Sequence, residues 1–183
     1  MSVGEWVIFL NGSYGVGKSA ALDHCGDLLA EAGVPFALMD VDWFHRSSPP
    51  GDDDPDNVRV EAENLAAVWS NYRSVGARQL VVSGVIAGVA DRERYETAFA
   101  LPVRSARLEA GPEVTASRLR RRYSPDQAPA LAWHLERYAA LTRRLVDADL
   151  DELTLATDEL SPGAVARHIL SHFGVLPCVP PTP

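Results

Sequence analysis

The sequence predicts an α/β protein of three layers, in which a five-stranded parallel sheet lies between two layers of helices. Two observations support this fold class. Short apolar runs alternate along the chain with longer segments whose apolar residues recur at helical spacing. The short runs are apolar almost throughout, which is typical of strands that are buried on both faces of a parallel sheet.

The first half of the chain contains three expected strands and two helices. A strand over 6–10 precedes a helix over 18–32, which Gly33 ends. A second strand covers 34–39, and the polar, proline-rich residues 46–57 form a loop. A helix over 58–75 precedes a third strand over 79–82. The apolar face of that helix consists of Val60, Leu65, Val68, Trp69 and Tyr72.

In the second half, a short helix over 91–99 precedes a fourth strand over 103–108. Helices over 112–122 and 129–146 follow, and then a fifth strand over 153–156. Ser161 and Pro162 are a suitable N-cap and first-turn pair for a last helix that ends near Gly174. Because no repeat or linker interrupts the pattern, we expect residues 1–176 to form a single domain and 177–183 a loose tail.

Composition excludes several classes of protein. The 183 residues, of which 46% are hydrophobic, suit one compact domain. A net charge of −8 argues against a general nucleic-acid binder, which is usually basic. The sequence has neither a membrane-spanning apolar run nor a secretion signal, so we expect a cytoplasmic protein. Cys25 and Cys178 lack metal-type spacing and are expected to be free thiols.

The most specific motif is GSYGVGKS, Gly12 to Ser19, which directly follows the first strand and matches G-x-x-x-x-G-K-[ST]. Its glycines allow successive N–H groups to point at phosphate oxygens, and the following helix adds its positive N-terminal end. Lys18 would reach the β- and γ-phosphates, and the Ser19 hydroxyl would bind Mg²⁺. The motif therefore predicts ATP and Mg²⁺ as cofactors. The residues expected to bind the nucleotide here are Gly12, Ser13, Tyr14, Gly15, Val16, Gly17, Lys18, Ser19 and Ala20.

Two acids, Asp40 and Asp42, follow the second strand, at the sheet edge where ligands of such folds bind. In an extended segment both side chains would point to the same side. We expect Asp42 to take the proton of an acceptor hydroxyl, and Asp40 to bind Mg²⁺ through water. The alternative is a pair of solvated acids in a turn.

Arginines over 118–122 supply positive charge that the acidic chain otherwise lacks. Arg118 and Arg122 share a helix face, and Arg121 is three residues from Arg118. A short connection leads to a second helix that carries His134 and Arg137. Residues 118–137 are therefore expected to form a short lid whose arginines neutralise the transferring phosphoryl group. A solvated basic helix face is the alternative.

These features together resemble the small P-loop kinases, a group that includes shikimate, gluconate and adenylylsulfate kinases and chloramphenicol phosphotransferase. The resemblance rests on the strand–GSYGVGKS–helix unit and on MDVD, RLRRR and ATDELSP. The loop and the second half also resemble the tunicamycin-resistance type of P-loop protein. The resemblance implies a P-loop NTPase fold with a short lid. It also implies nucleotide or lid contacts for Arg118 and Arg122, and an adenine site bordered by Thr157 and Asp158.

Other nucleotide-binding classes fit the sequence less well. The third strand ends in Val81-Val82-Ser83-Gly84, without the acid that holds Mg²⁺ in motor and transport ATPases. The guanine signature N-K-x-D is absent from the sequence. A motor ATPase and a GTP switch are therefore disfavoured, whereas strands that end in small residues occur in the gluconate-kinase type.

The acceptor pocket is expected between the second-strand exit, helix 58–75 and the third-strand exit. Its possible walls are Trp43, Phe44, His45, Trp69, Ile86 and Arg92, although Trp69 suits the core better. The acidic loop residues Asp52 to Asp56 favour a neutral or cationic acceptor, or else are solvated without contacting ligand.

We therefore predict an ATP-dependent phosphotransferase that acts on a hydroxyl of a small molecule, with Lys18, Asp42, Arg118 and Arg122 as its catalytic residues. The alternative is a nucleotide-binding resistance or regulatory protein that sequesters its ligand. A nucleotide or a nucleic-acid end as acceptor would need a basic groove, for which Arg46 and Arg59 give thin support. The acceptor and the oligomeric state are left open.

Overall fold

The computed structural model describes residues 5–177 of the chain. A single five-stranded sheet has the strand order β2-β3-β1-β4-β5, and each pair of neighbouring strands is parallel. The strands are β1 Val7–Gly12, β2 Phe36–Asp40, β3 Gln79–Ser83, β4 Val103–Glu109 and β5 Leu153–Ala156. The helices are α1 Lys18–Glu31, α2 Val58–Ser74, α3 Val89–Phe99, α4 Pro112–Arg122, α5 Ala128–Ala148 and α6 Pro162–His172. The predicted α/β fold class is confirmed.

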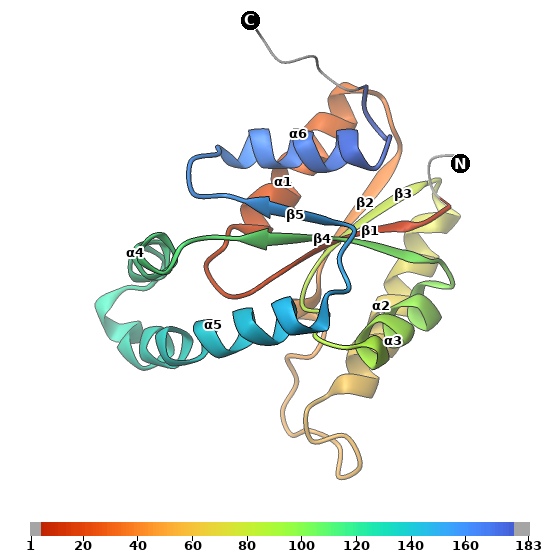
Figure 1. Ribbon diagram of the computed structural model, residues 1–183. Helices are drawn as coiled ribbons and strands as arrows, with labels where there is room; N and C mark the ends of the chain where they lie inside the picture. Colours follow the sequence, from red (N-terminus) through yellow and green to blue (C-terminus); the bar gives the residue numbers. More distant parts are fainter. Residues whose placement is uncertain (1–4, 178–183) are drawn as a thin grey trace, which may run out of the picture.

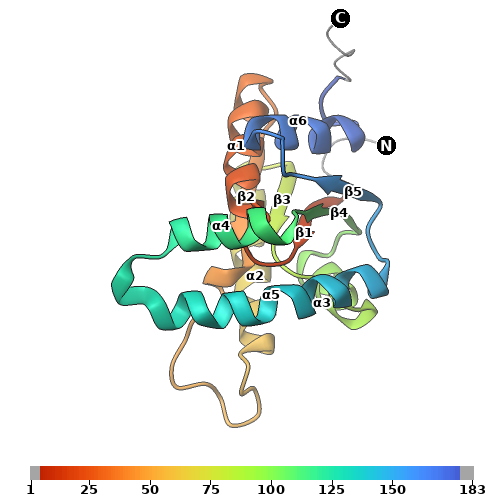
Figure 2. The same cartoon turned by 60° about the vertical axis from the view of Figure 1, so that its left-hand side comes forward.

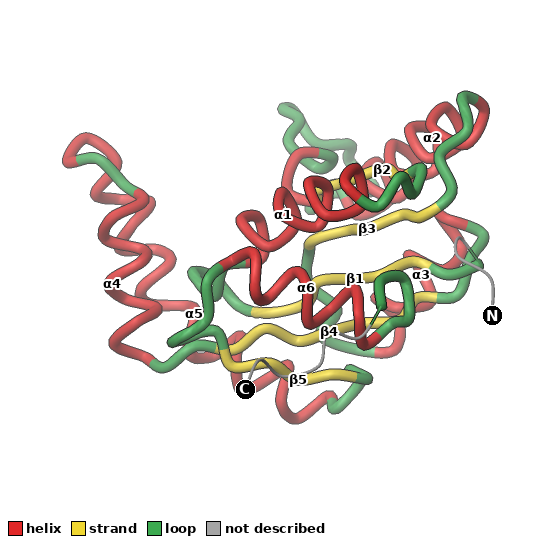
Figure 3. Tube along the Cα trace, turned by 90° about the horizontal axis from the view of Figure 1, so that it is seen from above, coloured by secondary structure: helices red, strands yellow, loops and turns green. Residues whose placement is uncertain are grey.

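Helices cover both faces of the sheet, as expected of parallel strands that are apolar throughout (Figure 1). Along β1, Ile8 and Leu10 join the core beneath α1 and α6, whereas Val7 and Phe9 join the core on the α2 and α3 side. This alternation follows from the two-residue period of a strand. Seen from above, α1 and α6 lie along the sheet while α4 projects beyond its edge (Figure 3).

Most of the predicted packing of the helices is confirmed. Cys25 of α1 and Trp69 of α2 are buried in the core. The predicted apolar face of α2 was wrong at Tyr72, which is 41% exposed. An acidic residue, Glu61, is buried at the start of the same helix. Cys178 and almost all of the predicted loose tail lie outside the described residues.

The segment after β2 differs from the sequence prediction. The strand ends at Asp40, and Val41–Trp43 forms a turn of 3₁₀ helix, η1. Asp40 accepts a hydrogen bond from the backbone N–H of Asp42, at 3.2 Å. The expected extended geometry was therefore wrong, because the carboxylate of Asp40 caps the turn that carries Asp42. Both acids nevertheless line the same cavity.

Helices α4 and α5 form an arm, defined here as residues 112–148, with a short 3₁₀ turn, η2 (Pro125–Gln127), between them. The arm runs out past the carboxyl end of the sheet and returns beneath it (Figure 2). Leu145 near the end of α5 is buried, so the arm is attached to the body of the molecule at its returning end. Among the described residues, none of the helices is long and apolar enough to cross a membrane.

Candidate active site

The phosphate-binding motif forms a tight loop between β1 and α1. Gly12 has a φ of 146° and Gly17 a φ of 104°, in the region that favours glycine. A Cβ at Gly12 would lie 2.6 Å from the carbonyl oxygen of Leu108, so the neighbouring strand also excludes a side chain there. Gly17 is the N-cap of α1, which directs the free N–H groups of that helix towards the loop.

Lys18 lies over this loop and is the only lysine in the sequence. Its Nζ donates hydrogen bonds to the carbonyl oxygens of Gly12, at 2.7 Å, and Ser13, at 2.9 Å. Burial lowers the pKa of Lys18 to about 8, against the opposing effect of Asp42 and Asp40 and with a further lowering by Arg122. The site therefore disfavours the charged form of Lys18, and an anionic ligand beside it would stabilise that form.

The hydroxyl of Ser19 points at the carboxylate of Asp40. Ser19 Oγ donates a hydrogen bond to Asp40 Oδ2 at 2.9 Å, at the opening of the phosphate-binding loop. Both are hard oxygen donors, which suit Mg²⁺. The described residues contain no cluster of three or more acidic, histidine or cysteine ligands. The two oxygen donors of Ser19 and Asp40 fit Mg²⁺, which keeps several waters and binds substrate phosphates rather than an all-protein cage.

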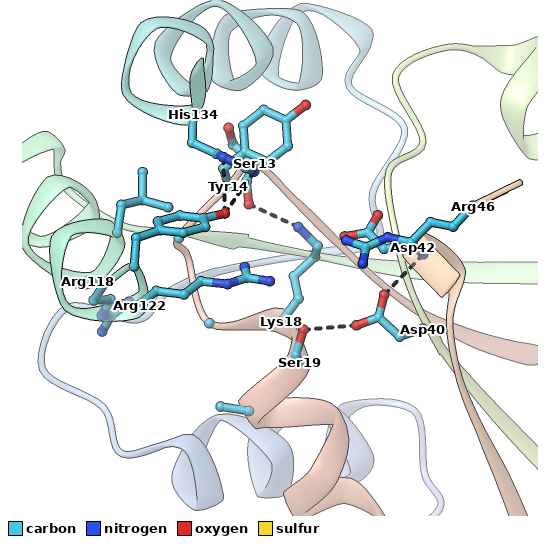
Figure 4. A pocket seen from close by; sticks show the side chains of 15 residues that line it. Ser13, Tyr14, Lys18, Ser19, Asp40, Asp42, Arg46, Arg118, Arg122 and His134 are labelled. Atoms are coloured by element: carbon cyan, nitrogen blue, oxygen red, sulfur yellow. Dashed lines mark hydrogen bonds between the residues drawn. The ribbon is translucent and has the colours of Figure 1, made fainter. Parts of the chain in front are cut away.

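One cavity of about 400 Å³ brings the loop and the arm together (Figure 4). The phosphate-binding loop and the arginine-bearing arm face each other across the cavity. Asp40, at the end of β2, and Asp42, in η1, also line it. The lining residues are Ser13, Tyr14, Gly15, Gly17, Lys18, Ser19, Ala20, Asp40, Asp42, Arg46, Arg118, Leu119, Arg122, Tyr123 and His134. Most of the residues predicted for the site therefore line a single cavity, whereas Gly12, Val16 and Thr157 do not.

The two predicted arginines of α4 differ in their partners. Arg118 donates hydrogen bonds to the carbonyl oxygen of Val16 at 3.2 Å, and to the hydroxyl and carbonyl oxygens of Thr157 at 2.9 and 2.7 Å. Thr157 is only 3% exposed, and its hydroxyl also lies 2.9 Å from the Val16 carbonyl oxygen. It therefore supports the loop from the side away from the cavity. Within residues 5–177, Arg122 has no hydrogen bond or ion pair; its guanidinium lies 5.8 Å from the ring centre of Tyr123.

Four lining residues were not among the predicted site residues: Arg46, Leu119, Tyr123 and His134. The sequence had offered Arg46 only as thin support for a basic acceptor groove. The ring of His134 lies 4.8 Å from that of Tyr14, and the Tyr123 hydroxyl lies 3.1 Å from His134 Nδ1. His134 had been placed on the second lid helix, but its direction depends on how α5 lies against the loop. Arg121 and Arg137, which the arginine pattern left possible, do not line the cavity.

None of the predicted acceptor walls lines this cavity. Ile86 is fully buried, and Arg92 donates hydrogen bonds to the carbonyl oxygen of Leu150 and to Ser105. His45 turns towards helix α2, where its Nδ1 lies 2.9 Å from a carboxylate oxygen of Glu61. Apart from the phosphate-binding loop, the start of α1 and Asp40, the cavity is lined by residues of η1, the loop after it and the arm.

Comparison with known proteins shows the fold. No model of a known protein family matches the sequence, and no curated protein matches it. Among solved structures, the chain is similar to a tunicamycin resistance protein of Deinococcus radiodurans, with a TM-score of 0.64 and 21% identity over 97% of this chain and 99% of the other.

The chain is also similar to two kinases. A gluconokinase of Sinorhizobium meliloti matches with a TM-score of 0.54 and 21% identity over 93% of this chain and 92% of the other. An APS kinase of Mycobacterium tuberculosis, in complex with AMPPNP and APS, matches with a TM-score of 0.58 and 16% identity over 94% and 99%. The predicted fold, that of the small P-loop kinases, is confirmed.

Proposed function

We propose that this protein is an ATP-dependent phosphotransferase, which moves the γ-phosphoryl group of ATP·Mg to a hydroxyl of a small molecule. The observation that carries the proposal is the composition of one cavity. Lys18, Asp42 and Arg122 line it together, so a phosphate-binding loop, a carboxylate and a guanidinium without a partner among residues 5–177 converge on one space. Kinases among the similar structures support the same reaction class.

In the proposed reaction, the phosphate chain of ATP lies along the loop, and Lys18 and Arg122 neutralise the γ-phosphoryl group. Asp42 accepts the proton of the acceptor hydroxyl while the acceptor oxygen forms a bond to γ-phosphorus. The bond from γ-phosphorus to the bridging oxygen breaks, and its electron pair leaves with ADP. Acceleration comes mainly from positioning and electrostatic stabilisation, because the phosphoryl transition state needs little covalent help.

Arg118 has a supporting role in this proposal. Its guanidinium holds the carbonyl oxygen of Val16, at 3.2 Å, and so helps to keep the loop in its phosphate-binding shape. Ser19 would bind Mg²⁺ directly, and Asp40 would bind it through water. A Mg²⁺ ion held there supplies positive charge to the phosphate oxygens.

The test is ATP consumption by the purified protein with a panel of hydroxylated acceptors: nucleosides, nucleoside monophosphates, sugar acids, shikimate, aminoglycosides and phenicols. We expect one class to stimulate consumption, and Asp42→Asn to lower that rate roughly 10²- to 10⁴-fold while ATP binding is retained. Asp56→Asn is the control, because Asp56 is exposed and does not line the cavity. Full activity of Asp42→Asn would contradict the proposed role of Asp42.

A second candidate function is sequestration of a ligand without phosphoryl transfer. It is favoured by the similarity to a tunicamycin resistance protein over 97% of the chain. The two functions differ in their dependence on Asp42. A sequestering protein would bind ATP and its ligand without acceptor-dependent turnover, and Asp42→Asn would leave its protective effect in cells unchanged.

A further inference from the structure

Arg46 is a cavity residue that the proposed reaction does not use. It follows η1 and lines the same cavity as Lys18 and Asp42 (Figure 4). Its guanidinium lies 4.8 Å from the ring centre of Trp43. Within the described part of the chain it has no hydrogen bond and no ion pair. A guanidinium offers five N–H donors in a planar fork, so Arg46 presents unused donors to the cavity.

The backbone on both sides of Arg46 is anchored to helix α2 and its N-cap. Asn57 donates hydrogen bonds to the carbonyl oxygens of His45, at 2.9 Å, and Ser47, at 3.2 Å. Asn64 donates to the carbonyl oxygen of Phe44 at 2.9 Å. Two asparagine side chains therefore bind the three carbonyls that flank Arg46. This segment is held in place although it lies in a loop.

A buried acid completes the anchor. One carboxylate oxygen of Glu61 lies 2.9 Å from His45 Nδ1, and the other accepts a hydrogen bond from the hydroxyl of Tyr95 at 2.9 Å. Burial, and then the neighbouring Glu61, raise the pKa of Tyr95, so its hydroxyl stays protonated as a donor. Because a buried carboxylate needs such partners, the His45–Glu61–Tyr95 contact is a stable support for the Arg46 segment.

The acidic loop near Arg46 does not place its carboxylates in the cavity. Asp54 accepts hydrogen bonds from the backbone N–H groups of Arg59 and Val60, at the start of α2. Asp53 pairs with the guanidinium of Arg59, at 3.0 Å. None of the four acids of the loop, Asp52, Asp53, Asp54 and Asp56, lines the cavity. The sequence argument that this loop favours a neutral or cationic acceptor is therefore not supported by its position.

Two arginines of the cavity lack hydrogen-bond partners within the described part of the chain, and they come from opposite sides. Arg122 belongs to the arm and Arg46 to the segment after η1, next to Asp42 (Figure 4). In the proposed reaction, Arg122 serves the phosphoryl group. Arg46 lies on the side of Asp42, the proposed proton acceptor, where the acceptor must bind. The remaining cation therefore lies in the acceptor half.

We propose that Arg46 binds an anionic group of the acceptor, so that the substrate is a hydroxylated small molecule that also carries a carboxylate or a phosphate. A carboxylate or phosphate accepts two parallel N–H bonds from one guanidinium, which fixes the orientation of the molecule as well as its charge. The anchored backbone places Arg46 at the cavity before the ligand binds, and its guanidinium lies beside the Trp43 ring. This inference rests on the proposed function, because it assigns the acceptor half of the same cavity.

The test measures acceptor binding directly, by calorimetry, with the phosphate loop occupied by AMPPNP and Mg²⁺. The probes are matched pairs that differ in charge: shikimate and its methyl ester, glycerate and glycerol, ribose 5-phosphate and ribose. We expect an anionic member to bind roughly ten- to a hundredfold more tightly than its neutral partner. The carboxylate and phosphate pairs distinguish the two kinds of anion.

Two variants test whether Arg46 is the residue that causes the preference for an anionic acceptor. Arg46→Gln should bring the affinities of the pair to within a factor of about three, because the charged donors are lost. Arg73→Gln is the matched control, since the Arg73 guanidinium also lies over a tryptophan, 5.9 Å from the Trp69 ring, and does not line the cavity. AMPPNP affinity should be unchanged in both variants, which shows that both are folded.

The inference is overturned if no anionic member binds at millimolar concentration, or if the anionic preference survives Arg46→Gln. Either result leaves the proposed function intact wherever acceptor-dependent ATP consumption is seen and is lost in Asp42→Asn. Conversely, an anionic preference that depends on Arg46, without ATP turnover, would support the subsite and count against phosphoryl transfer.

Discussion

The two sides of the cavity are built in different ways. The loop wall, residues 13–20, is one continuous stretch of chain in which the side chains of Ser13 and Lys18 have hydrogen-bond partners. Ser13 Oγ donates to the carbonyl oxygen of Tyr138 at 2.8 Å, and Lys18 donates to two loop carbonyls. The other side, here called the assembled wall, comes from separate segments. It consists of Asp40, Asp42 and Arg46 at and after the end of β2, and of Arg118, Leu119, Arg122, Tyr123 and His134 in the arm. Its Arg46 and Arg122 have no hydrogen-bond partner among the described residues.

Under the proposed function, this difference separates nucleotide binding from acceptor binding. A continuous, hydrogen-bonded loop has its shape before any ligand arrives, so little ordering accompanies phosphate binding. The assembled wall offers unused charged donors whose positions depend on distant contacts. We therefore expect changes in the loop wall to affect nucleotide binding, and changes in the assembled wall to affect the acceptor while nucleotide binding is kept.

The largest expected effect is that of Lys18→Ala, which removes the central cation of the loop wall. We expect acceptor-dependent kcat/KM to fall by about 10³- to 10⁵-fold, because charge on the transferring group is no longer neutralised. ATP affinity, measured by calorimetry, should fall as well. Arg78→Ala, a change at a cation outside the cavity, is the control. Unchanged ATP affinity in Lys18→Ala would contradict the role of the loop wall.

Glu61→Gln tests the support of the assembled wall. The substitution keeps the size of the buried side chain but weakens its contacts with His45 and Tyr95. We expect the free energy of unfolding to fall by about 1–3 kcal/mol in urea titrations, with weaker acceptor binding and unchanged ATP affinity. Glu63→Gln on the exposed face of α2 is the matched control. A loss of ATP affinity in Glu61→Gln would show that the two walls are not separable.

The lowered pKa of Lys18 predicts a pH dependence of the loop wall. Because that pKa is about 8 rather than 10.5, the ligand-free protein binds fewer protons than the unfolded chain between these values. This group therefore makes the ligand-free protein more stable as pH rises through that window. Nucleotide binding needs the charged form, so ATP affinity should fall by up to about tenfold per pH unit above pH 8.

The measurement of that pKa is direct, since Lys18 is the only lysine in the sequence. Protein labelled with ¹³C-lysine gives a single lysine side-chain signal in an NMR titration, with no assignment step. Saturating ATP·Mg should raise the titration midpoint, because bound phosphate favours the charged amine. A midpoint near 10.5 in the ligand-free protein would show that burial does not perturb Lys18.

The smallest expected effect is that of Thr157→Val, behind the loop wall. The Thr157 hydroxyl accepts a hydrogen bond from Arg118, and its Oγ lies 2.9 Å from the Val16 carbonyl oxygen. Its removal should lower stability by about 0.5–1.5 kcal/mol and weaken ATP binding by a few fold. The control is Thr154→Val, on the exposed side of β5. Equal effects of the two changes would argue against support of the loop from behind.

The loop wall could be predicted from sequence because its chemistry is local. The glycines, Lys18 and Ser19 are adjacent in the chain, and both the preceding strand and the following helix are marked by their own apolar spacing. Arg118 was also predicted, from its spacing on α4, but its hydrogen bonds to the loop were not. Those bonds depend on where α4 lies relative to the end of β5, which no residue spacing within either element reveals.

The assembled wall could not be predicted in the same way. Asp42 was identified from its place after β2, yet the extended geometry assumed for it was wrong, because the Asp40 carboxylate caps a turn there. Arg46 and His134 line the cavity through the course of a loop and the rotation of a helix. His45, predicted as a cavity wall, is held by Glu61 instead.

The sequence by itself determined the order of strands and helices, the parallel sheet and the phosphate-binding loop. These depend on interactions between residues close in the chain and on the period of apolar side chains. Only the tertiary structure decided which charges meet across the cavity. That Arg46 and Arg122 have no hydrogen-bond partner among residues 5–177 depends on what the rest of the fold places near them, since such bonds act over only about 3 Å.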